Sequence, residues 1–263
     1  MKIYKAKKSL GQNFLKSELA LRKIIEAGEI VATDTIIEIG PGKGALTERL
    51  LENNCKVIAV EKDYELFEFL KDKFASQISS GTLVLVRGDI LEFEVDDYKL
   101  QNYKIIANIP YNITGAILKK FLTAPHQPER MVLMVQNEVA KRIVARDNKE
   151  SILSISVKAY GEPKMVMKVP ARYFSPAPKV DSAVILIKNI SRNTFSIGKI
   201  NEERFWELVK AGFAHKRKKL SGNLRSFFAL KKKFLDSFGN KRAEDLTLSD
   251  WILLSGTEDD LKS

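Results

Sequence analysis

The feature that most constrains the fold is a glycine-rich stretch, EIGPGKGALT, at residues 38–47. It follows a β-rich run that begins at residue 35, and it leads into residues 45–51, where apolar side chains recur three and four positions apart. Glycines allow a sharp turn and a close approach of the backbone to a ligand. A strand, a glycine loop and a helix in this order predict the ligand-binding edge of a parallel α/β sheet.

The same alternation continues to about residue 190 and predicts βαβ units in one open, largely parallel sheet. Seven β-rich runs are the predicted strands: residues 35–39, 56–60, 82–86, 104–107, 131–135, 165–169 and 183–187. A second helix is predicted over residues 66–74. Residues 151–160 are ambiguous, because their Ile and Val content favours a strand while the spacing of Ile152, Ile155 and Ala159 also fits a helix.

A polar stretch after Lys188 separates this α/β region from a helix-forming one. We therefore predict an α/β domain at residues 1–190 and a small all-helical domain at residues 191–263. Within the latter, Phe205, Leu208 and Val209 belong to one amphipathic stripe, and a second stripe begins with Leu224, Phe227 and Phe228.

Positive charge is concentrated in the helical region. The chain carries a net charge of +11, and residues 199–242 contain 13 basic and 4 acidic residues, with clusters at residues 216–219 and 231–233. Such clusters favour binding to phosphates, because each neutralised phosphate releases condensed counterions. A solvated helix face, an acidic protein surface and an anionic membrane are the alternatives.

Several features argue against membrane insertion, secretion and metal binding. No apolar run reaches the about 18 residues that span a bilayer, and the N-terminus lacks the apolar core of a secretory signal. We therefore expect a cytoplasmic protein. The single cysteine, Cys55, cannot form an internal disulfide and lies beside a predicted buried strand. His126 and His215 are isolated in the sequence, so no metal site is predicted.

Two carboxylates at predicted strand ends suggest a nucleotide-like ligand. Glu61 lies 21 residues after Gly40, where it can accept hydrogen bonds from ribose hydroxyls. Asp89 ends the next strand and is placed to recognise an adenine or its sugar edge. Because Gly40, Gly42 and Ala45 also satisfy the dinucleotide fingerprint, a nicotinamide-dependent dehydrogenase fits these residues as well.

The sequence NIPY, at residues 108–111, separates these alternatives. The exocyclic nitrogen of adenine is a poor nucleophile, because its lone pair is delocalised into the ring. The side-chain oxygen of Asn108 and the backbone carbonyl of Ile109 can each accept one amino hydrogen, while Pro110 stiffens the turn and Tyr111 offers a stacking face. The base must leave its stack at a cost of about a few kcal/mol, which stacking on the ring partly offsets. An ordinary proline turn is the alternative.

With these motifs together, the chain resembles the ribosomal RNA adenine dimethyltransferase family, and within it the bacterial small-subunit branch. The motifs that carry the resemblance span nearly the whole chain: KKSLGQNFL at residues 7–15, EIGPGKGALT at 38–47, Glu61, Gly88 with Asp89, NIPYNIT at 108–114, VQNEVAKRI at 135–143 and FSPAPKVDSAV at 174–184. The resemblance implies a Rossmann-like methyltransferase sheet and S-adenosylmethionine as the cofactor.

The resemblance also implies residue roles. The cofactor-binding residues would be Asn13, Leu15, Gly40, Gly42, Glu61, Asp89, Ile90 and Asn108. The catalytic, base-binding residues would be Asn108, Ile109, Pro110, Tyr111 and Phe174, with Phe174 as a second stacking wall beside Tyr111. Without the resemblance, packing in the core is the alternative for Phe174. The implied reaction is dimethylation of two adjacent adenosines near the 3′ end of small-subunit rRNA, within a partly assembled subunit. We expect these adenosines in a hairpin loop, because an A-form duplex hides its base edges. A monomeric enzyme suits a substrate as large as a ribosomal subunit.

Three alternatives stay open at this point. Large-subunit rRNA methylases that confer macrolide resistance share GQNFL and NIPY. Pro41, Ala177 and the segment at residues 242–251 resemble the small-subunit enzymes. Lys43 departs from them, because small-subunit members often carry an apolar residue at this position and resistance methylases often carry Lys. A dehydrogenase should not need NIPY or the basic helical region, and a non-catalytic assembly factor would be expected to lose Asn108 or Tyr111.

Overall fold

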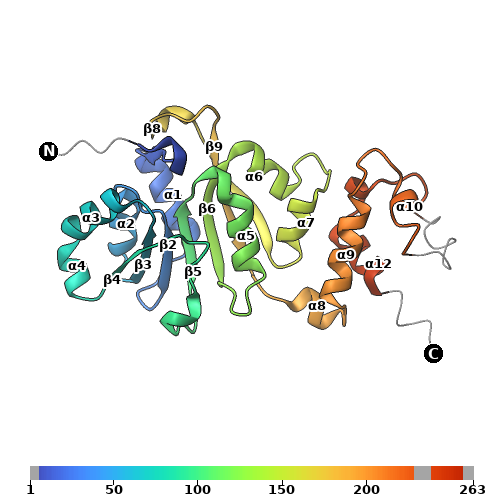
Figure 1. The fold of residues 1–263 in the computed structure, drawn as a ribbon, viewed down its shortest axis with the longest axis horizontal. Helices are drawn as coiled ribbons and strands as arrows, with labels where there is room; N and C mark the ends of the chain where they lie inside the picture. Colours follow the sequence, from blue (N-terminus) through green and yellow to red (C-terminus); the bar gives the residue numbers. More distant parts are fainter. Residues whose placement is uncertain (1–5, 228–237, 257–263) are drawn as a thin grey trace. The chain divides into compact units, whose positions relative to one another are not determined.

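The predicted sheet is present and has seven strands (Figure 1). The computed structural model describes residues 6–227 and 238–256 of the chain. In spatial order the strands are β4 (Leu83–Arg87), β3 (Lys56–Glu61), β2 (Thr35–Ile39), β5 (Lys104–Asn108), β6 (Arg130–Gln136), β9 (Ser182–Lys188) and β7 (Glu162–Val169). Each predicted run overlaps one of these strands, so the predicted seven-stranded α/β fold is confirmed.

The strand order creates a crevice at one edge of the sheet. Strands β4, β3, β2, β5 and β6 are parallel, whereas β9 is antiparallel to both of its neighbours, β6 and β7. The chain passes from β2 to β3 and β4 and then returns to the other side of β2 with β5. At such a switch point the loops after two adjacent strands diverge, and a ligand can bind between them.

The helices and the shorter elements complete the described structure. The α-helices are α1 (Glu18–Gly28), α2 (Ala45–Leu51), α3 (Tyr64–Lys73), α4 (Ala75–Ser79), α5 (Thr114–Leu122), α6 (Asn137–Val144), α7 (Ile152–Lys158), α8 (Asn193–Ile197), α9 (Glu202–Gly212), α10 (Leu220–Asn223) and α12 (Leu248–Gly256). A separate two-stranded ribbon pairs β1 (Phe14–Leu15) with β8 (Phe174–Ser175). Short 3-10 helices cover Lys8–Leu10, Val95–Tyr98, Tyr111–Ile113, Ala171–Tyr173 and Ala243–Asp245.

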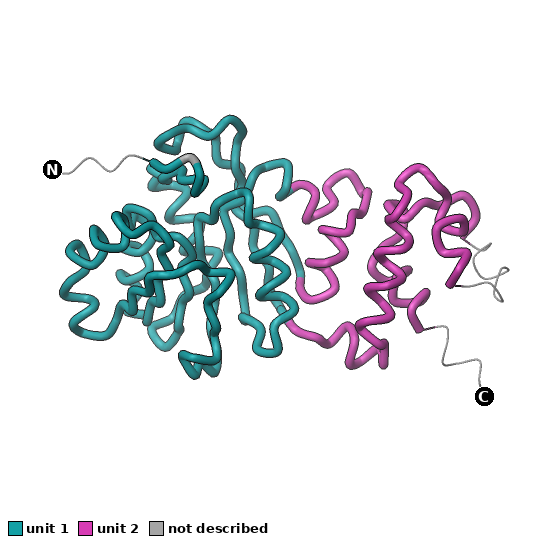
Figure 2. Tube along the Cα trace, in the orientation of Figure 1, with its two compact units in different colours: residues 1–140, 162–190 teal, residues 141–161, 191–263 magenta. Residues whose placement is uncertain are grey.

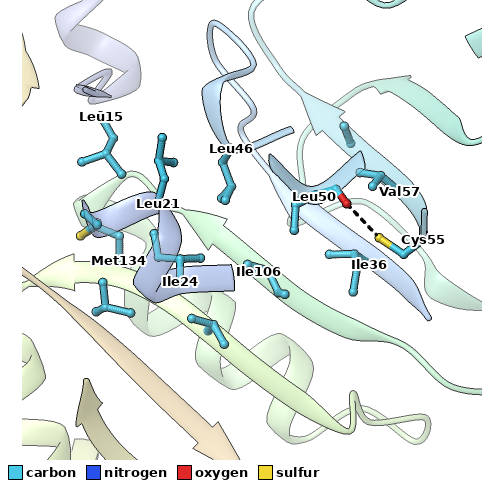
Figure 3. Close-up of a cluster of buried hydrophobic side chains, with 14 of the residues drawn as sticks. Leu15, Leu21, Ile24, Ile36, Leu46, Leu50, Cys55, Val57, Ile106 and Met134 are labelled. Atoms are coloured by element: carbon cyan, nitrogen blue, oxygen red, sulfur yellow. Dashed lines mark hydrogen bonds between the residues drawn. The ribbon is translucent and has the colours of Figure 1, made fainter. Parts of the chain in front are cut away.

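Helices α1, α2 and α3 contribute to one hydrophobic core with the sheet (Figure 3). Ile24 of α1 and Leu50 of α2 are fully buried together with Ile36 of β2 and Ile106 of β5. Cys55 lies in the same core and donates a hydrogen bond from its Sγ to the Leu50 carbonyl, 3.3 Å away. Burial raises the pKa of the Cys55 thiol to about 11, so it remains protonated and unreactive at neutral pH.

The chain divides into two compact units (Figure 2). The first contains residues 1–140 and 162–190, and the second contains residues 141–161 and 191–263. Residues 141–161 thus pack with the second unit, although the sequence analysis placed them in the first domain. No local sequence pattern signals this, because the segment lies between two strands of the sheet along the chain.

Contacts of Tyr160 and Lys149 explain why this segment belongs to the second unit. The Tyr160 ring lies 5.5 Å from the Phe195 ring and 6.2 Å from the Trp206 ring, between centroids, and its hydroxyl donates a hydrogen bond to Glu202. Lys149 forms an ion pair with Asp245.

Residues 151–160, whose conformation was ambiguous from the sequence, contain helix α7. Ser151 caps it, because its Oγ accepts a hydrogen bond from the Ser154 N–H at 3.1 Å. Ile155 and Val157 are fully buried.

The predicted stripe of the helical unit is buried on α9, where Phe205, Leu208, Val209 and Gly212 all lie inside. Leu224 of the second predicted stripe is also buried. Phe228 and the cluster at residues 231–233 lie outside the described residues.

Gly212 provides a test of this packing. A Cβ at Gly212 would approach the Trp251 ring to 2.3 Å, whereas a Cβ at Gly222 would meet nothing within 4 Å. We expect Gly212→Ala to lower the free energy of unfolding by about 1 to 3 kcal/mol through overpacking. Gly222→Ala, the matched control, should leave it unchanged or slightly raised. Denaturant unfolding of both variants measures this, and equal stabilities would contradict the packing of α9 on Trp251.

Candidate active site

A cavity of about 440 Å³ opens at the carboxyl ends of β2, β3, β4 and β5. Its walls come from the N-terminal segment at residues 9–16, the glycine loop and the residues that follow these strands. All eight predicted cofactor-binding residues line it: Asn13, Leu15, Gly40, Gly42, Glu61, Asp89, Ile90 and Asn108. Four of the predicted base-binding residues also line it: Asn108, Ile109, Pro110 and Tyr111. The sequence therefore identified residues that the fold brings together from positions up to 98 residues apart.

Glycine is needed at the three loop positions for different structural reasons. Gly40, Gly42 and Gly44 all have positive φ angles, of 62°, 62° and 77°, which residues with a Cβ rarely adopt. A Cβ at Gly42 would meet the Phe14 ring at 3.0 Å, and one at Gly44 would meet the Phe74 ring at 2.6 Å. Only Gly40 faces open space, with nothing within 4 Å. Gly40 is therefore the position where the backbone can come closest to a ligand, while the other two allow the protein itself to pack.

Glu61, the last residue of β3, presents a nearly buried carboxylate to the cavity. One oxygen accepts a hydrogen bond from the Gly42 N–H at 3.0 Å, and the other accepts one from the Asp63 N–H at 2.8 Å. Burial raises the pKa of Glu61. Each carboxylate oxygen has a second lone pair, so the fixed carboxylate can still accept hydrogen bonds from a ligand with two hydroxyls.

Asp89 follows β4 and is a second acceptor on the cavity wall. Its Oδ2 accepts a hydrogen bond from the Lys62 Nζ at 2.7 Å, and its Oδ1 accepts one from the Leu91 N–H at 3.0 Å. The hydrogen bond from Lys62 holds the pKa of Asp89 below its usual value. Asp89 is therefore ionised at neutral pH and suited to accept from an amino group.

Asn108 ends β5 with its side-chain amide held in one orientation. Its Nδ2 donates a hydrogen bond to the backbone carbonyl of Asn13, 3.1 Å away. Because a carbonyl can only accept, the amide nitrogen must face Asn13 and the Oδ1 must face away from it. The N-terminal segment thus leaves the Asn108 oxygen available as an acceptor at the cavity.

Tyr111 is anchored by a residue that sequence reasoning did not single out. Its hydroxyl lies 2.5 Å from the Oγ of Ser182, the fully buried first residue of β9. Burial raises the pKa of Tyr111, so the phenol remains neutral. Ser182 belongs to the FSPAPKVDSAV motif, which was the available signal. The structure therefore joins that motif to NIPY through one hydrogen bond.

Phe174 does not line the cavity, in contrast to the predicted stacking wall. Its side chain is 2% exposed and belongs to the hydrophobic core, and its backbone pairs with Leu15 across the ribbon. Successive side chains of a strand point to opposite sides. Because Phe174 points into the core, its neighbour Ser175 lines the cavity instead.

Asp63 holds the N-terminal segment in place, and sequence reasoning missed it. Its Oδ1 accepts a hydrogen bond from the Lys7 Nζ at 2.7 Å, and its Oδ2 accepts one from the Gln12 Nε2 at 2.7 Å. The same carboxylate caps helix α3 by accepting from the Glu65 N–H. Burial alone would raise the pKa of Asp63, but the hydrogen bonds from Lys7 and Gln12 outweigh it and keep the pKa low.

Glu38, in the glycine-loop motif, is a second missed residue. It is 1% exposed, lines the cavity and accepts a hydrogen bond from the Thr47 hydroxyl at 2.7 Å. Burial raises its pKa to about 8, so Glu38 is mostly protonated at neutral pH. Glu38 therefore adds little negative charge to the cavity that it shares with the Glu61 carboxyl group.

Comparisons with known proteins agree with this geometry. The model of the family Ribosomal RNA adenine dimethylase matches residues 3–255. A ribosomal RNA small subunit methyltransferase A from Dehalococcoides mccartyi is 42% identical over 256 residues, covering 94% of this chain and 86% of the relative. The protein of the same name from Fusobacterium nucleatum is 40% identical over 260 residues, covering 95% of this chain and 97% of the relative.

Solved structures show the same fold over most of the chain. A dimethyladenosine transferase from Plasmodium falciparum superposes with a TM-score of 0.76 at 27% identity, covering 92% of this chain and 96% of that one. The 23S rRNA methyltransferase ErmE superposes with a TM-score of 0.75, covering 92% of this chain and 98% of that one. Its identity of 24% makes this a likeness of fold alone.

Fold and site together define a Rossmann-like methyltransferase whose cavity is lined by the NIPY motif. The chain belongs to the ribosomal RNA adenine dimethylase family. The predicted family and enzyme class, an rRNA adenine dimethyltransferase, are thereby confirmed, and the dehydrogenase alternative is excluded.

The tie between Asp63 and the N-terminal segment predicts a local effect of mutation. We expect Asp63→Ala to release Lys7 and Gln12, so that trypsin cleaves the segment after Lys7, Lys8 or Lys16 at least several-fold faster. Asn201→Ala is the matched control, because Asn201 also caps a helix, α9, through the Arg204 N–H, but belongs to the other compact unit. Timed digestion followed by mass spectrometry measures the rates. Equal rates in the two variants would show that Asp63 does not hold the segment.

The raised pKa of Glu38 predicts a dependence of stability on pH. Between the usual glutamate pKa and about 8, the folded protein keeps a proton that the unfolded chain releases, so stability falls as pH rises through this window. Glu38→Gln cannot ionise. Relative to this variant, the wild type should therefore lose up to about 1.4 kcal/mol of unfolding free energy per pH unit there, and the difference should level off above the window.

Denaturant unfolding at a series of pH values measures this difference. Glu138→Gln, a change at an exposed residue of α6, is the control and should run parallel to the wild type. Parallel curves for Glu38→Gln as well would mean that Glu38 titrates in the usual range.

Proposed function

We propose that this enzyme dimethylates the exocyclic amino group of two adjacent adenosines in a hairpin loop near the 3′ end of small-subunit rRNA, during subunit assembly. The observation that carries the proposal is the Asn108 amide, which the hydrogen bond from its Nδ2 to the Asn13 carbonyl fixes in a cavity that Tyr111 also lines. The small-subunit assignment is supported by relatives with that name, which are about 40% identical over nearly the whole chain.

S-adenosylmethionine fits the cavity by size and by the chemistry of the residues present. The volume of about 440 Å³ lies within the range of about 300 to 1,000 Å³ that is usual for small-molecule sites. Glu61 would accept hydrogen bonds from the ribose hydroxyls, Asp89 would accept from the adenine amino group, and Gly40 would allow close approach of the backbone. When bound, this cofactor supplies a methyl group on a positively charged sulfur.

The residues of NIPY would align the target base. The Asn108 oxygen and the Ile109 carbonyl would each accept one amino hydrogen, which orients the nitrogen lone pair and enriches its electron density. Tyr111 would stack on the base, with its ring held by Ser182. The neutral phenol of Tyr111 does not act as a base. After methyl transfer, the proton that the amino nitrogen loses would therefore pass to solvent. Phe174 would act by supporting the ribbon of β1 and β8.

The described part of the helical unit would hold RNA phosphates. Lys216, Arg217, Lys218 and Lys219 are all exposed between α9 and α10. A base-specific enzyme needs unpaired nucleotides, because an A-form duplex hides its base edges. We therefore propose a hairpin loop as the target, presented by a partly assembled subunit to a monomeric, cytoplasmic enzyme. Among the described residues, no helix is both long and apolar enough to cross a bilayer.

A large-subunit rRNA methylase is the second candidate function. One observation favours it, namely that Lys43 is present in the glycine loop, where its Nζ lies 4.9 Å from the Phe14 ring centroid. The likeness to ErmE is one of fold alone, so it does not add to this candidate.

Methylation of isolated subunits tests the proposal. Purified enzyme, S-adenosylmethionine and unmethylated small subunits should yield two adjacent reverse-transcriptase stops, because dimethylation removes both amino hydrogens and blocks pairing. Asn108→Ala should abolish these stops while RNA affinity is retained. Asn102→Ala, a change at an exposed residue two positions before β5 begins, should leave them intact. Stops confined to large-subunit RNA, together with macrolide resistance, would refute the assignment.

A further inference from the structure

We propose that the segment at residues 172–180, here called the flanking loop and largely exposed apart from the buried Phe174, is a second nucleotide subsite that binds single-stranded RNA next to the target adenosine. In it, Tyr173 stacks on a neighbouring base, and Arg172 and Lys179 contact phosphates. The inference rests on the proposed function, because it assumes that an RNA base enters the cavity beside Tyr111.

The flanking loop begins at the wall of the cavity. Ser175, within the loop, lines the cavity, and Tyr173 lies two residues before it. The Tyr173 carbonyl accepts a hydrogen bond from the Lys16 N–H at 2.8 Å, so its backbone is fixed to the N-terminal segment that forms another wall (Figure 1). A nucleotide adjacent to one in the cavity would therefore reach Tyr173 first.

Asp181 closes the base of the flanking loop. Its Oδ1 accepts a hydrogen bond from the Ala171 N–H at 3.0 Å, and its Oδ2 pairs with the Lys168 Nζ at 2.7 Å. Its backbone carbonyl accepts from the Asn137 N–H. The loop is thus fixed at both ends, and its exposed side chains are presented by a rigid base.

Tyr173, the exposed aromatic residue of the flanking loop, is accessible to a partner. Tyr173 is 38% exposed, and Val180 in the same loop is 47% exposed. The Arg172 guanidinium lies 5.2 Å from the Tyr173 ring centroid. An exposed ring supported by an arginine is a stacking platform that accepts any base, because every base has a π-face.

The charge around Tyr173 favours RNA over an acidic or neutral partner. The flanking loop contains two basic residues, Arg172 and Lys179, and no acidic one. Both are exposed, as is Lys16 beside them. Among the described residues, neither Lys16 nor Lys179 has an ion-pair partner. Asp181, the nearest acidic residue along the chain, is already paired with Lys168. Basic side chains beside an exposed aromatic ring are what binding to single-stranded RNA requires.

The test compares Tyr173 with a second exposed tyrosine that has the same kind of neighbour. Tyr64 is 58% exposed, and the Arg87 guanidinium lies 5.7 Å from its ring centroid, but Tyr64 does not line the cavity. The RNA probe is a fluorescent hairpin with an unmethylated adenosine-containing loop, and its affinity is measured by anisotropy. S-adenosylmethionine affinity is measured by calorimetry in each variant.

We expect Tyr173→Ala to weaken hairpin binding about five- to a hundredfold, as loss of one stacked base does. Tyr173→Phe should bind within about twofold of the wild type, because it keeps the stacking face. Tyr64→Ala should bind as the wild type does, and all three variants should keep wild-type affinity for S-adenosylmethionine. Arg172→Ala with Lys179→Ala should reduce the slope of log affinity against log salt by roughly 0.7 per lost phosphate contact.

Four results would overturn the inference. They are unchanged binding by Tyr173→Ala, an equal loss in Tyr173→Phe, an equal loss in Tyr64→Ala, and a parallel loss of S-adenosylmethionine affinity, which would indicate a merely structural role. If Tyr173→Ala bound the hairpin normally but had a raised KM for small subunits, the flanking loop would contact a protein of the subunit instead of RNA. The anisotropy experiment measures binding and needs no turnover, so it tests the flanking loop alone. Failure of the wild-type enzyme to methylate small subunits would refute the proposed function separately.

Discussion

The buried carboxylate of Asp63 is the interaction on which the active site depends. It joins the N-terminal segment to the sheet through Lys7 and Gln12, and it caps α3. Its own backbone N–H holds the Glu61 carboxylate. The N-terminal wall of the cavity and the Glu61 carboxylate are therefore fixed by the same residue. Because the N-terminal segment also orients the Asn108 amide, this tie reaches from the end of β3 to the NIPY motif after β5.

Alignment of groups, rather than a strong base, is the chemistry that the site supports. Asn108 is oriented by the Asn13 carbonyl, and Tyr111 is held by Ser182 from the first residue of β9. The charges are also separated, since Asp89 is ionised beside Lys62 whereas burial raises the pKa of Glu38 to about 8. A cavity with few fixed charges and several fixed acceptors suits a neutral amino group as the nucleophile.

Much of the fold and of the site was predictable because both are encoded locally. The seven strands followed from runs of β-branched residues, and the glycine loop followed from a motif in which three residues need a positive φ angle. The presence of Glu61 and Asp89 on the cavity wall was predictable because parallel strands end at one edge of the sheet. The antiparallel direction of β9 was not predictable, because a strand carries the same pattern of side chains in either direction.

The sequence by itself determined the class of fold, the edge of the sheet that binds ligands and the acceptors that face the cavity. Only the tertiary structure decided that Phe174 packs in the core while Ser175 reaches the cavity, because a one-residue difference in register reverses which side chain points inward. The same holds for Asp63, whose partners lie 51 and 56 residues away, and for residues 141–161, which pack with the second unit. Such long-range contacts depend on how the elements meet in space, and no local pattern encodes them.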